Sequence, residues 1–215
     1  LPALGATTAD PDADSDAGDD SPSGTGAGSD PDGDAQRPWS EPQRSDDFTA
    51  AELAPRWHWQ ANPAPQRWRT GEGRVDLAFA PSTRGDLRDL GAILSQQLPG
   101  RPSQWSVELH LPAPASGPIG TERAGLVVLG HSYAWAGLRR DEEGIFLVHS
   151  TMAKDVADEV PHTHQRLSAE HTADVTAVLH ATVDGAGRVT LGASEISVRE
   201  GSSTEHRTIA EAELT

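Results

Sequence analysis

Six tryptophans are the residues of this sequence with the most informative chemistry. A flat indole ring can stack on the C–H face of a pyranose sugar while its edge stays hydrated. The same ring can also fill a hydrophobic core or an interface between domains. The sequence leaves these three roles open, with Trp59 and Trp135 as the possible sugar contacts. The full set is Trp39, Trp57, Trp59, Trp68, Trp105 and Trp135.

The spacing of the tryptophans favours packing roles for several of them. Trp57 and Trp59 are two residues apart, so an extended chain places both rings on one face. That arrangement suits packing against a second sheet or a neighbouring domain. Trp105 lies on the apolar side of the alternating stretch 104–111, which favours a place in the core. Trp39 lies in a polar segment, where we expect it to be exposed or docked on another domain.

The histidines offer a possible start for a metal site. His162 and His164 are spaced so that both imidazoles would leave one side of an extended segment, and His171 and Asp174 follow nearby. A zinc site needs three or four ligands at fixed positions. Nothing in the spacing fixes the geometry of a third ligand. The sequence therefore favours a solvated loop over a metal site, and we expect no metal and no cofactor.

A serine hydrolase triad can be assembled only on paper. Ser150, His149 and Asp155 are the residue types that such a triad requires. No glycine pattern of a nucleophile elbow surrounds Ser150. We therefore expect no catalytic residues in this chain.

The N-terminal part of the chain is acidic and poor in large side chains. Residues 1–47 contain twelve acidic residues and two arginines, a net charge of -10 out of the total of -16. Residues 7–34 consist almost entirely of Asp, Ser, Gly, Ala, Pro and Thr. Such a segment cannot bury enough apolar surface to offset the entropy of ordering. The sequence predicts a disordered linker over residues 1–45 and one folded domain over 46–215.

Two short runs in the linker resemble loops that wrap calcium. Alternating aspartates supply the hard oxygen ligands that Ca²⁺ prefers. Neither run has the glycine at the sixth loop position that the sharp turn requires. A solvated linker is therefore the favoured interpretation, with calcium binding as the open alternative. The aspartates are Asp12, Asp14 and Asp16, followed by Asp30, Asp32 and Asp34.

Composition excludes several other classes of partner. No basic stripe is present that could neutralise a phosphate backbone, so we expect no nucleic-acid partner. No apolar run approaches the length of a membrane span, and no signal segment opens the chain, so we expect no membrane partner. The absence of cysteine is compatible with a bacterial cytoplasm and with secretion. The chain begins at Leu1 without an initiator Met, so we expect a fragment of a longer protein.

Strand patterns run through the predicted domain. Residues 104–111 alternate apolar and polar side chains, as do residues 74–79. Turn sequences rich in Gly, Asp and Pro separate the strand candidates. These patterns predict an all-β fold, an antiparallel two-sheet β-sandwich. The other strand candidates are residues 92–98, 125–129, 133–139, 145–150, 174–183 and 188–191.

Helical periodicity is limited to three short stretches, residues 49–53, 84–90 and 152–158. A parallel α/β fold needs crossover helices of a dozen or more residues between its strands. These stretches are too short or too polar for that role, which excludes the parallel alternative.

Three segments match one known family in order and spacing. They are residues 57–63 (WHWQANP), residues 93–97 (ILSQQ) and residues 124–135 (AGLVVLGHSYAW). These segments resemble the patterns W-x-W-N-x-N-P, N-x-L-x-Q-R and A-G-L-x-x-x-G-x-x-Y-A-Y. The patterns belong to the C-terminal β-sandwich of glycoside hydrolase family 43 enzymes, the β-xylosidases and α-arabinofuranosidases. Gln60 and Gln97 depart from them, because the family usually has Asn and Arg at these positions.

The resemblance implies a concanavalin A-like jelly roll. Family members continue with a Gly-rich, aromatic closing strand that this chain lacks, so we expect the sandwich to be without its last strand. Relatives also carry a catalytic β-propeller upstream, and residues 1–47 contain none of it. The resemblance therefore implies a fragment without the catalytic propeller.

The implied function is that of a noncatalytic accessory module in the breakdown of xylan or arabinan. The implied partner is a family 43 catalytic β-propeller domain, through which xylo- or arabino-oligosaccharides would be reached indirectly. The module would pack on that domain and shape the mouth of its pocket. Trp57, Trp59, Asn62 and Tyr133 are the residues expected to define the module, as packing or interface positions. The alternative is a free-standing carbohydrate-binding module that uses exposed aromatic rings.

Overall fold

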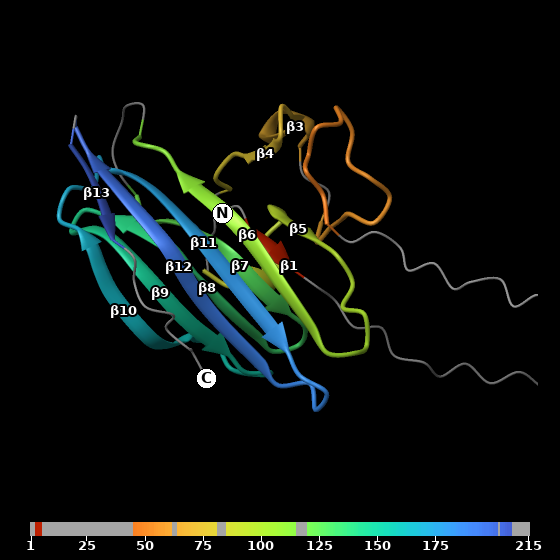
Figure 1. Ribbon diagram of the computed structural model, residues 1–215. Helices are drawn as coiled ribbons and strands as arrows, with labels where there is room; N and C mark the ends of the chain where they lie inside the picture. Colours follow the sequence, from red (N-terminus) through yellow and green to blue (C-terminus); the bar gives the residue numbers. More distant parts are fainter. Residues whose placement is uncertain are drawn as a thin grey trace, which may run out of the picture. The chain divides into compact units, whose positions relative to one another are not determined.

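The computed structural model describes residues 3–5, 45–61, 64–80, 85–114, 120–201 and 203–207 (Figure 1). One compact unit comprises Leu1–Thr8 and Asp47–Thr215, and Ala9–Asp46 form a second unit. Apart from Ser45 and Asp46, the second unit lies outside the described residues. The domain boundary after residue 45, the role of Trp39 and the calcium-like runs therefore stay predictions.

Strands form nearly all of the regular structure in the described residues, and the predicted all-β fold is confirmed. Two short 3₁₀ helices, η1 (Pro65–Arg67) and η2 (Leu87–Asp89), interrupt them. The strands are β1 (Ala3–Gly5), β2 (His58–Trp59), β3 (Trp68–Gly71), β4 (Arg74–Leu77), β5 (Ile93–Ser95), β6 (Ser103–Leu111), β7 (Glu122–Leu129), β8 (Tyr133–Asp141), β9 (Gly144–Met152), β10 (Val160–Ser168), β11 (Asp174–Val183), β12 (Val189–Glu200) and β13 (Ser203–Arg207).

The strands form a sandwich of two sheets. The larger sheet has the order β10-β9-β8-β7-β1-β5-β2, and the smaller has the order β13-β12-β11-β6. Figure 1 shows the smaller sheet lying across the strands β7 to β10 of the larger one. Among the described strands, β3 and β4 pair only with each other, as a separate hairpin. This arrangement agrees with the predicted antiparallel two-sheet sandwich of the concanavalin A-like type.

Strand β1 is an element that the sequence analysis did not contain. It lies between β5 and β7 and pairs with both of them in parallel, whereas the other described neighbours in this sheet are antiparallel. The first five residues, LPALG, carry no charged side chain, unlike the acidic run that begins at Asp10. The composition of this short stretch therefore suits a sheet, although three residues are too few for a period-two pattern.

The main core lies between the two sheets. The larger sheet contributes Leu138, Ile145 and Leu147, which are all 0 % exposed, and β11 contributes alternate residues from Val175 to Ala181. Trp105 packs against the edge of this core with its β6 neighbours, as the alternation predicted. Each fully buried aliphatic side chain stabilises the fold by about 1.5–3 kcal/mol.

The larger sheet is buried on its outer face as well. A second hydrophobic cluster covers β7, β8 and β9 there, beneath η2 and the segment that leads to β5. Strands buried on both faces read as nearly continuous apolar runs, which explains the sequence IFLVHS in β9. The cluster consists of Leu87, Leu90, Ile93, Val127, Leu129, Tyr133, Trp135, Phe146, Val148 and Met152.

Gly125 explains part of the A-G-L motif in β7. It pairs with Gly137 of β8, and a Cβ at Gly125 would lie 2.3 Å from the carbonyl oxygen of Ala136. A Cβ at Gly137 would lie 2.1 Å from the carbonyl oxygen of Ala124. The two strands therefore approach each other at a point where only glycine fits.

The predicted helical stretches are not α-helices. Residues 49–53 contain no helix, and residues 152–158 form the end of β9 and the loop after it. In 84–90 the described part contains only η2, which Asp86 caps by accepting a hydrogen bond from the backbone N–H of Arg88. These stretches are too short to repay the cost of helix nucleation. In the described part of the chain, no helix is both long enough and apolar enough to cross a membrane.

Candidate functional site

A pocket of about 190 Å³ opens beside Trp59, at the edge strand of the larger sheet. Trp59 and Trp68 are in contact with each other in its wall, with ring centroids 5.3 Å apart and ring planes inclined by 49°. Both rings are half-buried, so part of each stays accessible. The pocket is lined by Trp59, Ala64, Arg67, Trp68, Leu77, Ala78, Ala80, Gly91 and Ala92.

Backbone pairing fixes the position of Trp59. Strand β2 pairs antiparallel with β5, which places Trp59 opposite Leu94. The hydroxyl of Ser95 donates a hydrogen bond of 3.0 Å to the carbonyl of His58, and the N–H of Gln60 donates one to the carbonyl of Ile93. The ring of Trp59 is therefore held on a paired strand rather than on a free loop.

The chemistry of this pocket is largely apolar. Within the described part of the lining, Arg67 is the single charged residue, and its guanidinium donates a hydrogen bond of 3.0 Å to the carbonyl of Phe79. Ligand pockets of drug-sized molecules usually have volumes of about 300–1,000 Å³. A pocket of this size and composition suits one flat ring or one large apolar side chain.

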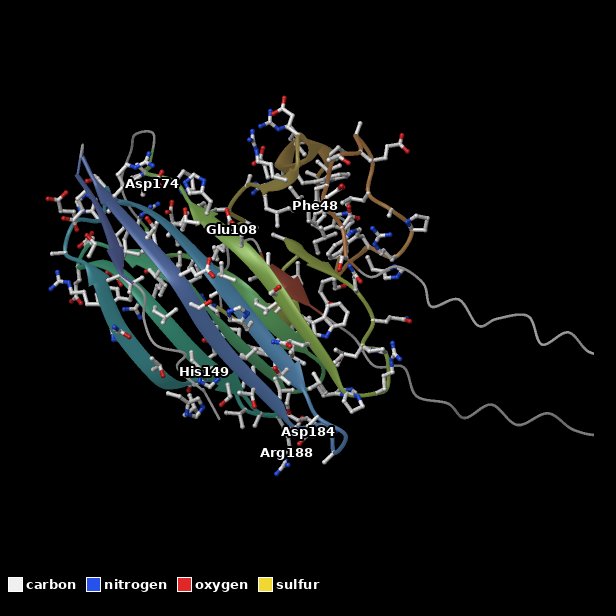
Figure 2. The ribbon with its side chains drawn as sticks, viewed as in Figure 1. Phe48, Glu108, His149, Asp174, Asp184 and Arg188 are labelled. Atoms are coloured by element: carbon white, nitrogen blue, oxygen red, sulfur yellow. The ribbon has the colours of Figure 1, made fainter. Side chains whose placement is uncertain are left out.

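The other residues predicted to define the module lie elsewhere. Trp57 packs against Phe48, with ring centroids 5.3 Å apart, and does not line the pocket. Figure 2 labels Phe48, which comes from the segment before β2. Asn62 lies outside the described residues. The structure thus brings Trp59 together with Trp68, a partner that the spacing of the tryptophans did not suggest.

A second site surrounds Tyr133 and Trp135 on the outer face of the larger sheet. Tyr133 is 3 % exposed and Trp135 is 2 % exposed. Both donate hydrogen bonds to the carboxylate of Glu159, the Tyr133 hydroxyl at 2.6 Å and the Trp135 indole N–H at 3.1 Å. Arg123 donates a third, with 2.8 Å between its guanidinium nitrogen and the carboxylate oxygen. These three residues form a carboxylate-binding site that Glu159 occupies.

The electrostatics of this second site suit a bound carboxylate. The Arg123 guanidinium lies 5.1 Å from the centroid of the Trp135 ring, so a cation–π contact accompanies the ion pair with Glu159. Burial raises the pKa of Tyr133, and the hydrogen bond to Glu159 raises it further. The phenol therefore remains a hydrogen-bond donor across the physiological range. Removing the carboxylate would leave the Tyr133 hydroxyl and the Trp135 N–H without this acceptor, and Arg123 without its counter-ion, although its guanidinium would keep the hydrogen bond to the carbonyl of Gly85.

The loop between β9 and β10 delivers Glu159 to this site. The backbone N–H of Lys154 donates to the hydroxyl of Ser132, and the guanidinium of Arg88 donates to the carbonyl of Val156. Residues 153–158 of this loop are exposed, and Glu159 is the first side chain of the segment that is partly buried. The loop is therefore attached at a few points, and Glu159 makes the strongest of its described contacts.

The predicted arrangement of His162 and His164 is wrong. Strand β10 has an irregularity between Pro161 and Thr163, where the register against β9 shifts. A bulge of this kind breaks the period-two alternation, so the two imidazoles leave opposite faces of the strand. His162 meets Thr151 and the ring of His149, while His164 meets other residues of the neighbouring strands. The predicted loop is also corrected, because both residues lie in β10.

No group of three or more potential metal ligands occurs among the residues that the structure describes. His149 (Figure 2) is 2 % exposed, and its Nδ1 atom is buried without a hydrogen-bond partner. Burial lowers the pKa of His149, and the neighbouring His162 lowers it further. His149 and Ser150 are adjacent in β9 and therefore point to opposite faces, which is incompatible with a hydrogen-bonded triad.

Sequence reasoning missed Arg123 and Glu159. Arg123 is the second residue of β7, a strand that the apolar pattern located only from residue 125. Glu159 ends a polar loop with no periodicity, so no local signal distinguishes it from the other acids. The contact joins residues 36 positions apart, and only the fold brings them together.

Comparisons with known proteins give a family and no individual relative. A family model described as the β-xylosidase C-terminal concanavalin A-like domain matches residues 45–210. No curated protein and no solved structure matched the chain. The matched range includes both the Trp59 pocket and the Glu159 site.

Proposed function

The chain belongs to the family of β-xylosidase C-terminal concanavalin A-like domains, and from this we propose that it packs on a family 43 catalytic domain and helps shape its pocket. Membership of this family supports an accessory module of a glycoside hydrolase. In the proposed role the module contributes to the breakdown of xylan or arabinan through its catalytic partner, and carries no catalytic residues of its own.

The observation that supports this role is the apolar Trp59–Trp68 pocket. Interfaces between proteins are anchored by aromatic and aliphatic side chains that enter apolar pockets. A sugar ring needs hydrogen-bond partners for its hydroxyl groups, and among the lining residues that the structure describes Arg67 is the only charged one. The chemistry of the pocket therefore favours a partner's apolar side chain over a free sugar. Its place on the edge strand β2 leaves it open to a neighbouring domain.

Addition of the chain to a family 43 β-xylosidase that lacks its own C-terminal domain tests the proposal. We expect kcat/KM for nitrophenyl β-D-xyloside to rise when the chain is added. Trp59→Ala should weaken this effect, because it removes one wall of the pocket. Trp57→Ala is the matched control, since it removes a half-buried tryptophan outside the pocket. The chain alone should not hydrolyse the substrate.

The alternative is a free-standing carbohydrate-binding module. The observation in its favour is the pair of adjacent, half-buried indole rings, whose accessible parts can contact one sugar ring. Affinity electrophoresis in soluble xylan distinguishes the two functions. Retardation that disappears in Trp59→Ala and persists in Trp57→Ala would favour direct sugar binding. Unretarded migration of all three proteins would favour the interface.

A further inference from the structure

A slot in the larger sheet lies between β5 and β7, and the three residues of β1 occupy it (Figure 1). Strand β1 pairs with all three residues of β5 and with two residues of β7, Gly125 and Leu126. Among the described strands, this is the only backbone pairing that joins β5 and β2 to the rest of the sheet. Because the family model matches residues 45–210, the strand that completes the sheet comes from outside the matched domain.

The slot is buried and apolar on both faces of the sheet. The register places the first residue of β1 between Ile93 and Gly125. It places the second residue between Leu94 and Leu126. Ile93 belongs to the second hydrophobic cluster, whereas Leu126 belongs to the main core, and neither is more than 6 % exposed. An occupant must therefore supply backbone hydrogen bonds to both neighbours without a charged side chain, because orphaned backbone groups and buried charges are costly.

Strand β1 uses only part of the slot. On its other side, all eight residues of β7, from Glu122 to Leu129, pair with β8. On the slot side, two of them pair with β1, and the rest have no strand partner among the described residues. The pairing with β1 is also parallel, which is slightly less stable per residue than antiparallel pairing. A longer or antiparallel strand would therefore form a more extensive ladder with β7.

We propose that the slot between β5 and β7 binds an extended segment of another polypeptide, rich in small and aliphatic residues, and that β1 is a displaceable occupant of this slot. The sequence of β1, ALG, shows which chemistry fits. Addition of a strand to a sheet edge takes its affinity from main-chain hydrogen bonds and its specificity from alternate side-chain positions. The slot offers two such edges at once, one on β5 and one on β7. The proposal does not depend on the proposed interface at Trp59.

Fluorescence anisotropy of the full chain with a labelled peptide LPALGATT, the sequence of residues 1–8, tests the proposal. Leu4→Pro weakens the chain's own strand, because proline donates no backbone hydrogen bond and inner strands exclude it. We expect Leu4→Pro to bind the peptide about 10-fold or more tightly than the wild type, in which β1 competes for the slot. Ala9→Pro is the matched control, because it lies just beyond the segment Leu1–Thr8 that contains β1, and it should bind as the wild type does.

A second peptide tests the chemistry of the slot. The Leu4→Asp version of the peptide should not bind to the Leu4→Pro chain, because its charge would lie at the buried register position between Leu94 and Leu126. Equal binding of the two peptides would show that the slot does not select an apolar segment, and the proposal would be wrong.

The comparison of the chains is equally decisive. If Leu4→Pro binds the peptide no more tightly than the wild type, β1 does not compete for the slot and the proposal fails. If circular dichroism shows that Leu4→Pro does not fold alone, the same spectrum is recorded with the peptide present. Recovery of the β-sheet signal supports the proposal, and an unchanged spectrum overturns it. The β-xylosidase assay uses chains whose own strand is intact, so failure here leaves its result unaffected.

Discussion

Trp59 and Trp135 lie in the same sheet and differ in almost every property that decides a role. Trp59 is half-buried on an edge strand and shares an open apolar pocket with Trp68. Trp135 is 2 % exposed on an inner strand, and its indole N–H is bonded to Glu159. Residue type alone made both of them candidate sugar contacts. Their surroundings differ, because Trp59 lies at an open apolar surface and Trp135 lies in a closed site with polar partners.

These surroundings determine how each region can discriminate between partners. An apolar pocket selects mainly by shape and size, and it tolerates related side chains. A site built from buried donors rejects any ligand that leaves the donors unpaired. The Trp59 region therefore suits a protein surface, and the Trp135 region suits one defined chemical group.

The largest expected effect is on stability and comes from the closed site. Trp135→Ala should lower the free energy of unfolding by about 3–5 kcal/mol, because it opens a large cavity and removes a hydrogen bond to Glu159. Urea denaturation measures the loss. If Trp135→Ala lowers the free energy of unfolding by less than Trp59→Ala does, the assignment of Trp135 to a packed second core is wrong.

Glu159→Gln should have the next largest effect. Tyr133 and Trp135 donate to different oxygens of the carboxylate, so the amide, with one acceptor oxygen, keeps only one of these two hydrogen bonds and also loses the charge that pairs with Arg123. We expect a loss of about 1–2 kcal/mol, because hydrogen bonds to charged groups are strong and this carboxylate is partly hydrated. High salt should reduce the difference between wild type and variant, since it screens the ion pair. Glu142→Ala serves as the control in the same urea titrations.

Trp59→Ala should cost about 1 kcal/mol, because a half-buried ring loses only part of its apolar contact. The effect on partner binding should exceed the effect on stability. Paired urea titrations and β-xylosidase assays on Trp59→Ala and Trp57→Ala measure both quantities. If Trp59→Ala and Trp57→Ala change kcat/KM in the β-xylosidase assay equally, the pocket has no special role in binding the partner.

The fold class was predictable because alternation is a local signal. The inward face of β6, from Trp105 onward, and the limits of β11 both followed from period two. Family resemblance was predictable from three short motifs, and the family match confirms it. The A-G-L motif now has a physical reason in the close approach of Gly125 to β8.

The features that the sequence analysis missed leave no periodic signal in the local sequence. Strand β10 is exposed on both faces over most of its length, so it shows no apolar periodicity, and its bulge reverses the expected side of His164. Strand β12 extends to Glu200, far beyond the predicted end at residue 191. Glu159 reaches Arg123 only through the pairing of distant strands. The roles of Trp57, Trp59, Asn62 and Tyr133 as module-defining residues stay predictions.

The smallest expected effect of this series is a loss of stability on acidification. It arises at His149 in the sandwich and not at either tryptophan site. Burial lowers the pKa of His149 in the folded state, so the unfolded state binds its proton first as pH falls. Stability is therefore complete above the ordinary histidine pKa of about 6.5, and it declines as pH falls from there towards the lower folded pKa. His149→Gln should flatten this part of the pH profile. Urea titrations between pH 5 and pH 8 measure the slope. A slope that persists in His149→Gln would assign the titration to another group, and the tryptophan sites would then have to be compared at one fixed pH.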